Sequence, residues 1–320
     1  MTSVESVVEG RSICVVVPCF NEEAQILKVL TTLPGYVTAI CVIDDCSTDT
    51  TLKTVEEYKG KDSRIHLIRH DVNQGVGGAI ATGYKWARDQ NCDVAVVMAG
   101  DAQMNPSDLP NLLKPIFLDQ VDYTKGNRLL HVQAERIPRV RFFGNAILSM
   151  LTKIASGYWH IADSQCGYTA ISRRALHMLD WDRMYKRYGQ PNDLLVMLNV
   201  HDMRVRDVDV EPLYGVGERS GFRAHRMIWP IGRLLWRRFF WRLKWKYVVR
   251  DFHPLVLFYS LALLFGALVV IFLIRLVMLW VTLGYVPELT ALATMFCFST
   301  SFQALFFAMW MDMEANRSLR

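Results

Sequence analysis

Two long uncharged stretches near the C-terminal end constrain this chain more than any other feature. Residues 255–274 and 289–311 are stretches of 20 and 23 residues without a charged side chain, and Arg275 follows the first and Glu288 precedes the second. As a helix, each stretch is long enough to cross a hydrocarbon layer of about 30 Å. We therefore expect a two-helix transmembrane anchor over residues 253–314, followed by a short tail over 315–320.

Basic charge gathers directly before these stretches. Nine of the 36 Lys and Arg residues lie within 223–250, and without them the formal charge of +5 would become −4. Such a balance excludes a generally cationic, nucleic-acid-coating protein. Apolar residues recur there every four positions, at Leu235, Phe239, Leu243 and Tyr247. This pattern, rich in tryptophan, is typical of an amphipathic interfacial helix on an anionic membrane. We expect juxtamembrane amphipathic helices over 223–252, with an ordinary packed helix as the alternative.

The distribution of charge also predicts an orientation. Positive charge lies before the first stretch and after the second, at Arg317 and Arg320, whereas the connection at 284–287 has no Lys or Arg. The positive-inside rule then places both termini in the cytoplasm. The start, MTSVESVVEGRS, lacks a basic head followed by an apolar core, so no signal peptide is expected. Seven cysteines without a CxxC pair argue against a disulfide framework or a zinc site.

The first half of the chain alternates short apolar runs with helical patterns. Continuous runs rich in β-branched residues predict buried parallel strands at Ile13–Val17, Ala39–Ile43, Ile65–Ile68 and Asp93–Met98. Less regular strands are expected near 123–126, 167–172 and 205–210. The helices between them are expected at 22–33, 50–58, 75–90, 139–156, 173–179 and 192–200. This alternation predicts an α/β fold with an open sheet, preceded by a flexible tail over 1–12.

Polar motifs follow the predicted strands, where open α/β sheets bind ligands. Val17-Pro18-Cys19-Phe20-Asn21-Glu22-Glu23 follows the first strand and Asp44-Asp45-Cys46-Ser47-Thr48-Asp49 the second, and Asn73-Gln74-Gly75-Val76-Gly77-Gly78 opens a helix. Carboxylates can accept hydrogen bonds from a base or a ribose. Glycines allow close backbone approach, and a helix N-terminus favours anions. The alternatives are helix caps at Asn21 and Asp49 and a tight packing turn at the glycines.

Together these motifs resemble the family 2 glycosyltransferases of the GT-A fold, and in particular the polyprenyl-phosphate glycosyltransferases. The resemblance runs from about Ile13 to Arg219. It implies a Rossmann-like GT-A catalytic domain over residues 13–222, with a mixed, mainly parallel sheet. It also implies a nucleotide site made of Pro18, Phe20, Asn21, Glu22, Asp44, Asp45, Asn73, Gly75, Gly78 and Ala102.

The fourth strand is followed by a variant of the family's metal motif. Family members usually carry Asp-x-Asp, often followed by x-Gln, whereas this chain reads Ala99-Gly100-Asp101-Ala102-Gln103. The resemblance implies Mg²⁺ or Mn²⁺ held by Asp101 and Gln103, with a substrate diphosphate completing the coordination. Ala99 in place of the first carboxylate bears on metal affinity and metal choice. The alternative is a turn closed by Asp101 and Pro106.

Several arginines and acids resemble the family's acceptor side. Lys125-Gly126-Asn127-Arg128 is similar to its Gly-Ser-Arg segment, and Arg219-Ser220 to its Arg-x-x-x-Ser region. Arginine binds phosphate through paired hydrogen bonds and stays charged. The resemblance implies an acceptor phosphate site of Arg128, Arg139, Arg219 and Ser220. It adds Asp163 and Asp193 to Asp101 and Arg128 as expected catalytic residues, although Asp193 could instead cap a helix. No general base is assigned, because a phosphate monoester is already ionised near pH 7.

The resemblance implies an inverting, metal-dependent glycosyltransferase. It would move a hexose from a UDP- or GDP-linked donor to polyprenyl phosphate at the cytoplasmic membrane face. The expected partners are the nucleotide sugar, the polyprenyl phosphate and the bilayer, without nucleic acid, and a homo-oligomer is left open. One alternative is a processive polysaccharide synthase, but its Gln-x-x-Arg-Trp motif and additional spans are not found in the sequence. Another is a non-catalytic nucleotide-sugar-binding scaffold, which Ala99 favours.

Overall fold

The computed structural model of the chain describes residues 8–128, 139–211, 213 and 224–320, without side chains at 139–146 and 224–228. These residues form two compact units. The first contains the chain up to Phe239 together with Leu319–Arg320, and the second contains Phe240–Ser318.

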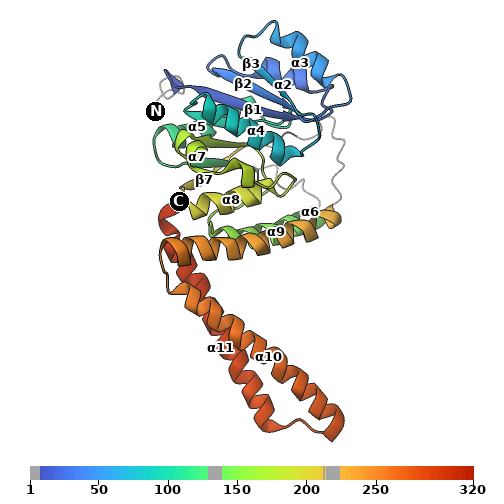
Figure 1. Cartoon of the computed structure of the whole chain (residues 1–320), viewed down its shortest axis with the longest axis vertical. Helices are drawn as coiled ribbons and strands as arrows, with labels where there is room; N and C mark the ends of the chain where they lie inside the picture. The colour runs from blue at the N-terminus through green and yellow to red at the C-terminus, as the bar shows by residue number, and fades with distance from the viewer. Residues whose placement is uncertain (1–7, 129–138, 212, 214–223) are drawn as a thin grey trace. The chain divides into compact units, whose positions relative to one another are not determined.

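The first unit is built on a seven-stranded sheet with the strand order β3-β2-β1-β4-β6-β5-β7 (Figure 1). The strands are β1 (Ile13–Cys19), β2 (Ala39–Asp44), β3 (Ile65–Arg69), β4 (Val94–Val97), β5 (Tyr123–Asn127), β6 (Thr169–Ser172) and β7 (Val205–Asp209). β1 to β4 pair in parallel, as do β5 and β7, whereas β6 is antiparallel to both β4 and β5. The expected mixed, mainly parallel sheet is confirmed.

Helices cover both faces of this sheet. The helices of the first unit are α2 (Ile26–Thr32), α3 (Thr51–Lys59), α4 (Val76–Asp89), α5 (Leu109–Phe117), α6 (Arg139–Ser156), α7 (Arg173–Met178) and α8 (Gln190–Val200), and α9 (Ala224–Lys244) begins in this unit and ends in the second. Cys14 and Val16 of β1 pack in a core with α4, α7 and α8, while Val15 and Val17 pack in another with α2, α3 and α5. Burial on both faces explains why β1, β2 and β4 are continuous apolar runs.

The expected start of the first helix is wrong. The sequence predicts a helix from Glu22 capped by Asn21, but α2 begins at Ile26. Asn21 has a φ of 58°, and its side-chain Oδ1 accepts a hydrogen bond from the Thr48 backbone N–H at 2.8 Å. The amide side chain therefore joins two strand exits and does not cap the helix that follows it.

The apolar stripe of α9 faces inward. Leu235, Leu243 and Tyr247, the last in the short π-helix η4 (Trp245–Arg250), are buried. The outward face instead combines Trp229 and Trp236 with exposed basic residues. Tryptophans and basic residues therefore form the exposed surface of α9, and its apolar stripe is mostly buried.

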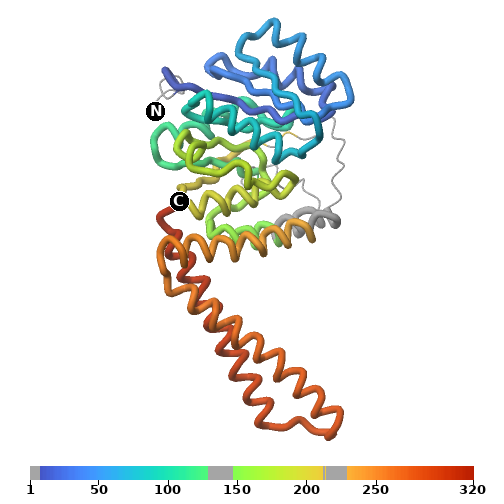
Figure 2. The backbone as a smooth tube through the Cα atoms, viewed as in Figure 1, coloured from blue at the N-terminus to red at the C-terminus, as the bar shows by residue number. Residues whose placement is uncertain are grey.

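The second unit contains two long apolar helices, α10 (Leu255–Leu283) and α11 (Glu288–Ala315). Figure 2 shows them as an antiparallel pair, and Ser301 Oγ donates a hydrogen bond to the Ala262 carbonyl oxygen between them at 2.8 Å. Both are long and apolar enough to cross a membrane, and most of their side chains are exposed. A helix in the core of a soluble protein would instead be mostly buried.

A buried polar network lies at the C-terminal end of α11. The guanidinium of Arg242 donates to both carboxylate oxygens of Asp312, at 2.8 and 2.9 Å. Tyr247 Oη donates to Asp312 Oδ1 at 2.7 Å, and Lys246 Nζ donates to Asn316 Oδ1 at 2.9 Å. All five side chains are buried, and the network links α9 and η4 to α11 with Arg242 and Asp312 as an ion pair.

Candidate active site

Three neighbouring strands, β2, β1 and β4, end at one edge of the sheet, and a residue in the left-handed backbone region follows each. Asn21, Cys46 and Ala102 have φ angles of 58°, 66° and 56°. Residues other than glycine adopt this region at an energetic cost, and such residues concentrate at functional sites. This edge is the one where the sequence motifs predict the ligand site.

The exits of β1 and β4 lie against each other. The Gly100 backbone N–H donates to the Pro18 carbonyl oxygen at 3.1 Å. A Cβ at Gly100 would lie 3.0 Å from the Cys19 Cβ, a tight contact that glycine avoids. The approach places Asp101 beside Glu22. Burial, together with the negative charges of Asp101 and Asp49, raises the pKa of Glu22 to about 7.

The Asp101 turn offers oxygen donors for a cation. Asp101 Oδ1 accepts a hydrogen bond from the Gln103 backbone N–H at 3.1 Å, which fixes the turn. Among the described residues, no cluster of three His, Cys, Asp or Glu side chains could hold a metal by itself. Mg²⁺ commonly binds through one or two carboxylates together with substrate phosphates and water. The crowded carboxylates of Glu22 and Asp101 therefore fit a divalent cation that arrives with a diphosphate.

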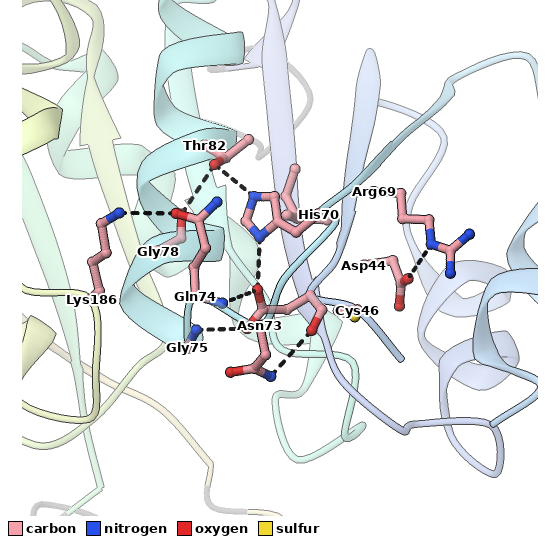
Figure 3. Close-up of polar contacts among 12 residues, drawn as sticks. Asp44, Cys46, Arg69, His70, Asn73, Gln74, Gly75, Gly78, Thr82 and Lys186 are labelled. Atoms are coloured by element: carbon pink, nitrogen blue, oxygen red, sulfur yellow. Dashed lines mark hydrogen bonds and ion pairs between the residues drawn. The ribbon is translucent and has the colours of Figure 1, made fainter. Parts of the chain in front are cut away.

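Asp44 lies buried beneath the exit of β2. Its carboxylate oxygens accept from the Ser47 backbone N–H at 3.3 and 3.4 Å, and its Oδ2 lies 3.9 Å from Arg69 Nε (Figure 3). The side chain of Asp44 has no exposed surface. Asp44 therefore shapes the turn after β2, and its carboxylate does not line the open surface.

Asp45 connects the exit of β2 to the start of α4. Its Oδ1 accepts from the Gln74 backbone N–H at 2.8 Å, and its Oδ2 accepts from the Gly75 backbone N–H at 2.7 Å. Asn73 Nδ2 donates to the Asp45 carbonyl oxygen at 3.2 Å. The amides that a helix N-terminus could offer to a phosphate thus already donate to a carboxylate of the protein.

The glycine-rich turn packs tightly against residues 185–187. A Cβ at Gly75 would lie 2.6 Å from the Lys186 carbonyl oxygen, and one at Gly77 would overlap the Tyr185 carbonyl oxygen. The Gly78 backbone N–H donates to the same Lys186 oxygen at 3.2 Å. Of the two readings of this motif, the geometry favours the packing turn, with Asn73 as its exposed polar residue.

His70 was not singled out from the sequence, although it follows β3 at the same edge. It is buried between Asp45 and Thr82, with nitrogen–oxygen distances of 2.7 and 2.9 Å. The signal that could have found it is the one used for the other strand exits, a polar residue directly after a buried run.

Arg128 and Asp163 meet at a second part of the edge, where β5 ends and β6 begins. Arg128 Nε donates to Asp163 Oδ2 at 2.8 Å, and Arg128 Nη2 donates to Asp163 Oδ1 at 3.2 Å. Burial opposes ionisation of Asp163, but Arg128 and Lys125 together hold its pKa below its ordinary value. The pair is a charged, half-open group suited to orienting an anion.

Two buried charged residues, Lys125 and Asp207, contact the segments next to this pair. Lys125 is fully buried, and its Nζ donates to the Cys166 carbonyl oxygen. On β7, Asp207 Oδ2 accepts from Asn127 Nδ2 at 3.1 Å and from the Ala162 backbone N–H at 2.7 Å. Burial raises the pKa of Asp207. These contacts fix the segment before Asp163 to the end of the sheet.

The carboxylate of Asp193 is occupied by contacts within the protein. It lies fully buried in the first turn of α8, where Arg238 of α9 donates to both of its carboxylate oxygens. Asp193 Oδ2 also accepts from the Tyr185 backbone N–H at 2.8 Å. Despite Arg238, burial raises its pKa. Asp193 thus connects α8 with α9 and with residues 185–187, the strap that packs on the glycine-rich turn.

The remaining expected residues divide by exposure. Phe20 is 45% exposed, whereas Pro18 and Ala102 are buried. Arg139 begins α6, but its side chain lies outside the described part of the chain. Arg219 and Ser220 also lie outside the described residues.

Residues 14–179 match the family model described as glycosyl transferase family 2. The match covers more than half of the chain and includes every strand exit described above except that of β7. The chain belongs to glycosyl transferase family 2.

Curated relatives of this glycosyltransferase act on lipid phosphates by name. The chain is 30% identical over 218 residues to UDP-N-acetylglucosamine–dolichyl-phosphate N-acetylglucosaminyltransferase of Methanococcus voltae, covering 64% of this chain and 86% of the relative. It is 27% identical to undecaprenyl-phosphate mannosyltransferase of Micrococcus luteus, covering 56% of this chain and 74% of the relative.

Solved structures support the fold of the glycosyltransferase. Glucosyl-3-phosphoglycerate synthase of Mycobacterium tuberculosis, in complex with Mn²⁺, UDP and phosphoglyceric acid, superposes with a TM-score of 0.56 at 20% identity. The superposition covers 75% of this chain and 81% of the synthase. The same synthase with Mg²⁺ and UDP gives a TM-score of 0.53.

Proposed function

We propose that this family 2 glycosyltransferase moves a sugar from a nucleoside diphosphate donor to a polyprenyl phosphate at a membrane surface. The observation that carries the proposal is the placement of two charged groups on one sheet edge. The Glu22 and Asp101 carboxylates lie at the exits of β1 and β4, and the Arg128–Asp163 pair lies at the exit of β5.

The exits of β1, β2 and β4 form the donor half. Phe20 presents an exposed aromatic ring on which a base can stack. Asn21 and Asn73 lie at the surface of the two turns beside it. Asp44 and Asp45 contribute indirectly, because their buried carboxylates accept hydrogen bonds from backbone amides of the turns and so fix them. The structural neighbour crystallised with UDP and Mn²⁺ agrees with a nucleotide donor.

A divalent cation suits the junction between the donor and the reacting bond. Asp101, Gln103 and Glu22 are the residues that would hold it. Mg²⁺ or Mn²⁺ at this position supplies positive charge to the departing diphosphate. Without such charge, the Glu22 and Asp101 carboxylates would repel the diphosphate. These side chains can therefore orient the donor only when the cation is bound.

The Arg128–Asp163 pair forms the acceptor half. The lipid phosphate oxygen attacks C1 of the sugar and forms the new C–O bond, while the bond from C1 to the diphosphate oxygen breaks and its electrons leave with the nucleotide. This in-line displacement inverts the anomeric centre. Arg128 orients the phosphate through paired hydrogen bonds, and Asp163 fixes the direction of the guanidinium. The acceptor is already ionised, so no base has to remove a proton.

The membrane brings the acceptor to the enzyme. α10 and α11 would span the bilayer, and the exposed tryptophans and arginines of α9 suit its anionic surface. Ile147, Met150 and Leu151 give α6 a second exposed apolar surface. Positive charge before α10 and after α11 supports an orientation with the catalytic domain and both termini in the cytoplasm. Confining enzyme and lipid to one surface raises their effective concentration.

An organic-extraction assay tests the proposal. Purified protein is given labelled UDP- and GDP-sugars with polyprenyl phosphate and Mg²⁺ or Mn²⁺, alongside EDTA and Asp101→Ala controls. We expect label in the organic phase that both controls remove, and the productive donor names the sugar and base. Binding of a nucleotide sugar without any lipid-linked label would contradict the proposal and favour a non-catalytic scaffold.

A further inference from the structure

His70 occupies a buried position between two parts of the donor half. Its Nδ1 lies 2.7 Å from Asp45 Oδ1, at the exit of β2. Its Nε2 lies 2.9 Å from Thr82 Oγ1, on α4 (Figure 3). The imidazole is 7% exposed, so it has no surface of its own for a ligand. Its function must therefore be carried out through the groups that it contacts.

The carboxylate of Asp45 collects three donors. Besides His70, the backbone N–H groups of Gln74 and Gly75 donate to it at 2.8 and 2.7 Å. A buried carboxylate is costly unless its oxygens accept hydrogen bonds from well-placed donors. Removing the His70 donor would leave Asp45 Oδ1 with one of its two donors. The carboxylate would then hold the Gln74 and Gly75 amides less firmly. Those amides begin the turn that presents Asn73.

The ring can donate to Asp45 in either protonation state. A carboxylate oxygen only accepts, so Nδ1 carries the proton. When His70 is neutral, Nε2 accepts from the Thr82 hydroxyl. When it is protonated, Nε2 donates to Thr82 Oγ1, and the hydroxyl turns to the Gly78 carbonyl oxygen, which lies 3.1 Å away. Thr82 thus adapts to the ring, and the bond to Asp45 is kept.

We propose that His70 is a positioning residue that orders the turn at 73–75 through Asp45 and so sets the affinity for the nucleotide donor. The proposal rests on the proposed function, because that function makes this turn part of the donor half. It separates the two halves of the site. His70 controls donor binding, and the Arg128–Asp163 pair remains unaffected.

Two substitutions of similar size distinguish the two ring nitrogens. In His70→Asn the side-chain amide can stand where Nδ1 stands and still donate to Asp45. In His70→Gln the amide reaches toward the position of Nε2 and Thr82, and the donor to Asp45 is lost. Thr82→Val removes the other contact and leaves Asp45 untouched. If His70 positions Asp45, the His70→Asn and Thr82→Val variants should exchange amides and bind the donor nearly as wild type does. The His70→Gln variant should differ strongly in both.

Hydrogen exchange in the full-length protein gives the first readout and needs no substrate. We expect His70→Gln to speed exchange of the Gln74 and Gly75 amides about ten-fold, and His70→Asn to change it less than three-fold. Calorimetric titration with UDP and with GDP, each with Mg²⁺, gives the second. The nucleotide that wild type binds should bind about ten-fold more weakly to His70→Gln. The KM for polyprenyl phosphate should stay within two-fold.

Several outcomes would overturn the proposal. One is equal exchange and equal affinity in the Gln and Asn variants. Another is a rise in both substrate KM values together with a lower melting temperature, which would indicate a general structural role. Failure of the proposed function looks different. In that case wild type makes no lipid-linked sugar, while the exchange of the 74–75 amides still decides whether His70 orders the turn.

Discussion

Arg128 binds Asp163 through two parallel hydrogen bonds, Nε to Oδ2 at 2.8 Å and Nη2 to Oδ1 at 3.2 Å. The pair joins the end of β5 to the segment that leads into β6. A planar fork of this kind recognises a phosphate only when its direction is fixed, and Asp163 fixes it.

Arg128→Lys should therefore impair acceptor use. Lysine keeps the charge but loses the paired geometry, so we expect kcat/KM for polyprenyl phosphate to fall about 100-fold while the donor KM stays within two-fold. Initial rates at varied acceptor concentration measure this. The matched control is Arg206→Lys on β7, where the guanidinium donates to Gln120. Equal losses in both variants would argue against an acceptor role for Arg128.

Restoring the family's missing carboxylate should strengthen metal binding. Ala99→Asp adds an oxygen donor two residues before Asp101, and we expect the Mg²⁺ concentration for half-maximal activity to fall about ten-fold. Activity titrated with Mg²⁺ after treatment with EDTA checks this. Unchanged metal dependence, with a folded variant, would show that position 99 lies away from the cation.

Gly77→Ala should destabilise the protein, because the new Cβ would overlap the Tyr185 carbonyl oxygen. Overpacking of this kind costs about 1–3 kcal/mol, and here the backbone of the 185–187 strap has to move. Gly35→Ala is the control, since nothing lies within 4 Å of its Cβ position. Thermal unfolding compares the two variants. Equal melting temperatures would show that the turn is not tightly packed.

His160 should make stability depend on pH. Burial lowers its pKa below 6.5, and the positive charges of Arg320 and Lys153 lower it further. The folded state therefore resists a proton that the unfolded chain accepts. The contribution is complete above pH 6.5 and is lost as the pH falls below it.

His160→Gln can keep the donor to the Val205 carbonyl oxygen, which Nε2 provides at 2.7 Å, and removes the titration. Between pH 7.5 and 5.5 we expect the melting temperature of wild type to fall about 2–3 °C more than that of the variant. Parallel slopes would assign the acid sensitivity to other groups.

Breaking the Arg242–Asp312 pair should be costly, and replacing both partners should not. Arg242→Met leaves Asp312 buried without its guanidinium, at a cost of about 3–5 kcal/mol. The double variant Arg242→Met/Asp312→Leu removes both charges and should recover most of the melting temperature. Detergent-solubilised protein unfolded by heat supplies the comparison. A double variant no more stable than the single one would contradict this account.

The sequence predicts the strands well because their side chains are buried on both faces. The run from Ala39 to Ile43 has no polar residue, and β2 begins at Ala39 and ends at Asp44. The two apolar spans are predictable for a related reason, since each is far longer than a buried strand or core helix requires. Local composition decides these elements without help from tertiary contacts.

The partners of the polar residues could not be predicted. Asn21 looks like a helix cap, but its amide contacts a turn 27 residues away. Asp193 resembles a family acid, yet its carboxylate binds Arg238 on α9. Short polar side chains bond equally well to near and distant amides, so only the fold decides between them. For α9, the apolar period identifies the buried face at Leu235 and Leu243 but does not say what covers it.

One consequence follows from the direction of β6. Because β6 runs against its neighbour β5, with Lys125 opposite Thr169, the intervening segment leaves the sheet and returns to it at the same edge. That segment carries Asp163 and α6. Replacing this segment would leave the strand order and every crossover unchanged. Divergent lipid acceptors could thus be acquired by replacing one excursion of the chain, while β1, β2 and β4 are inherited unaltered.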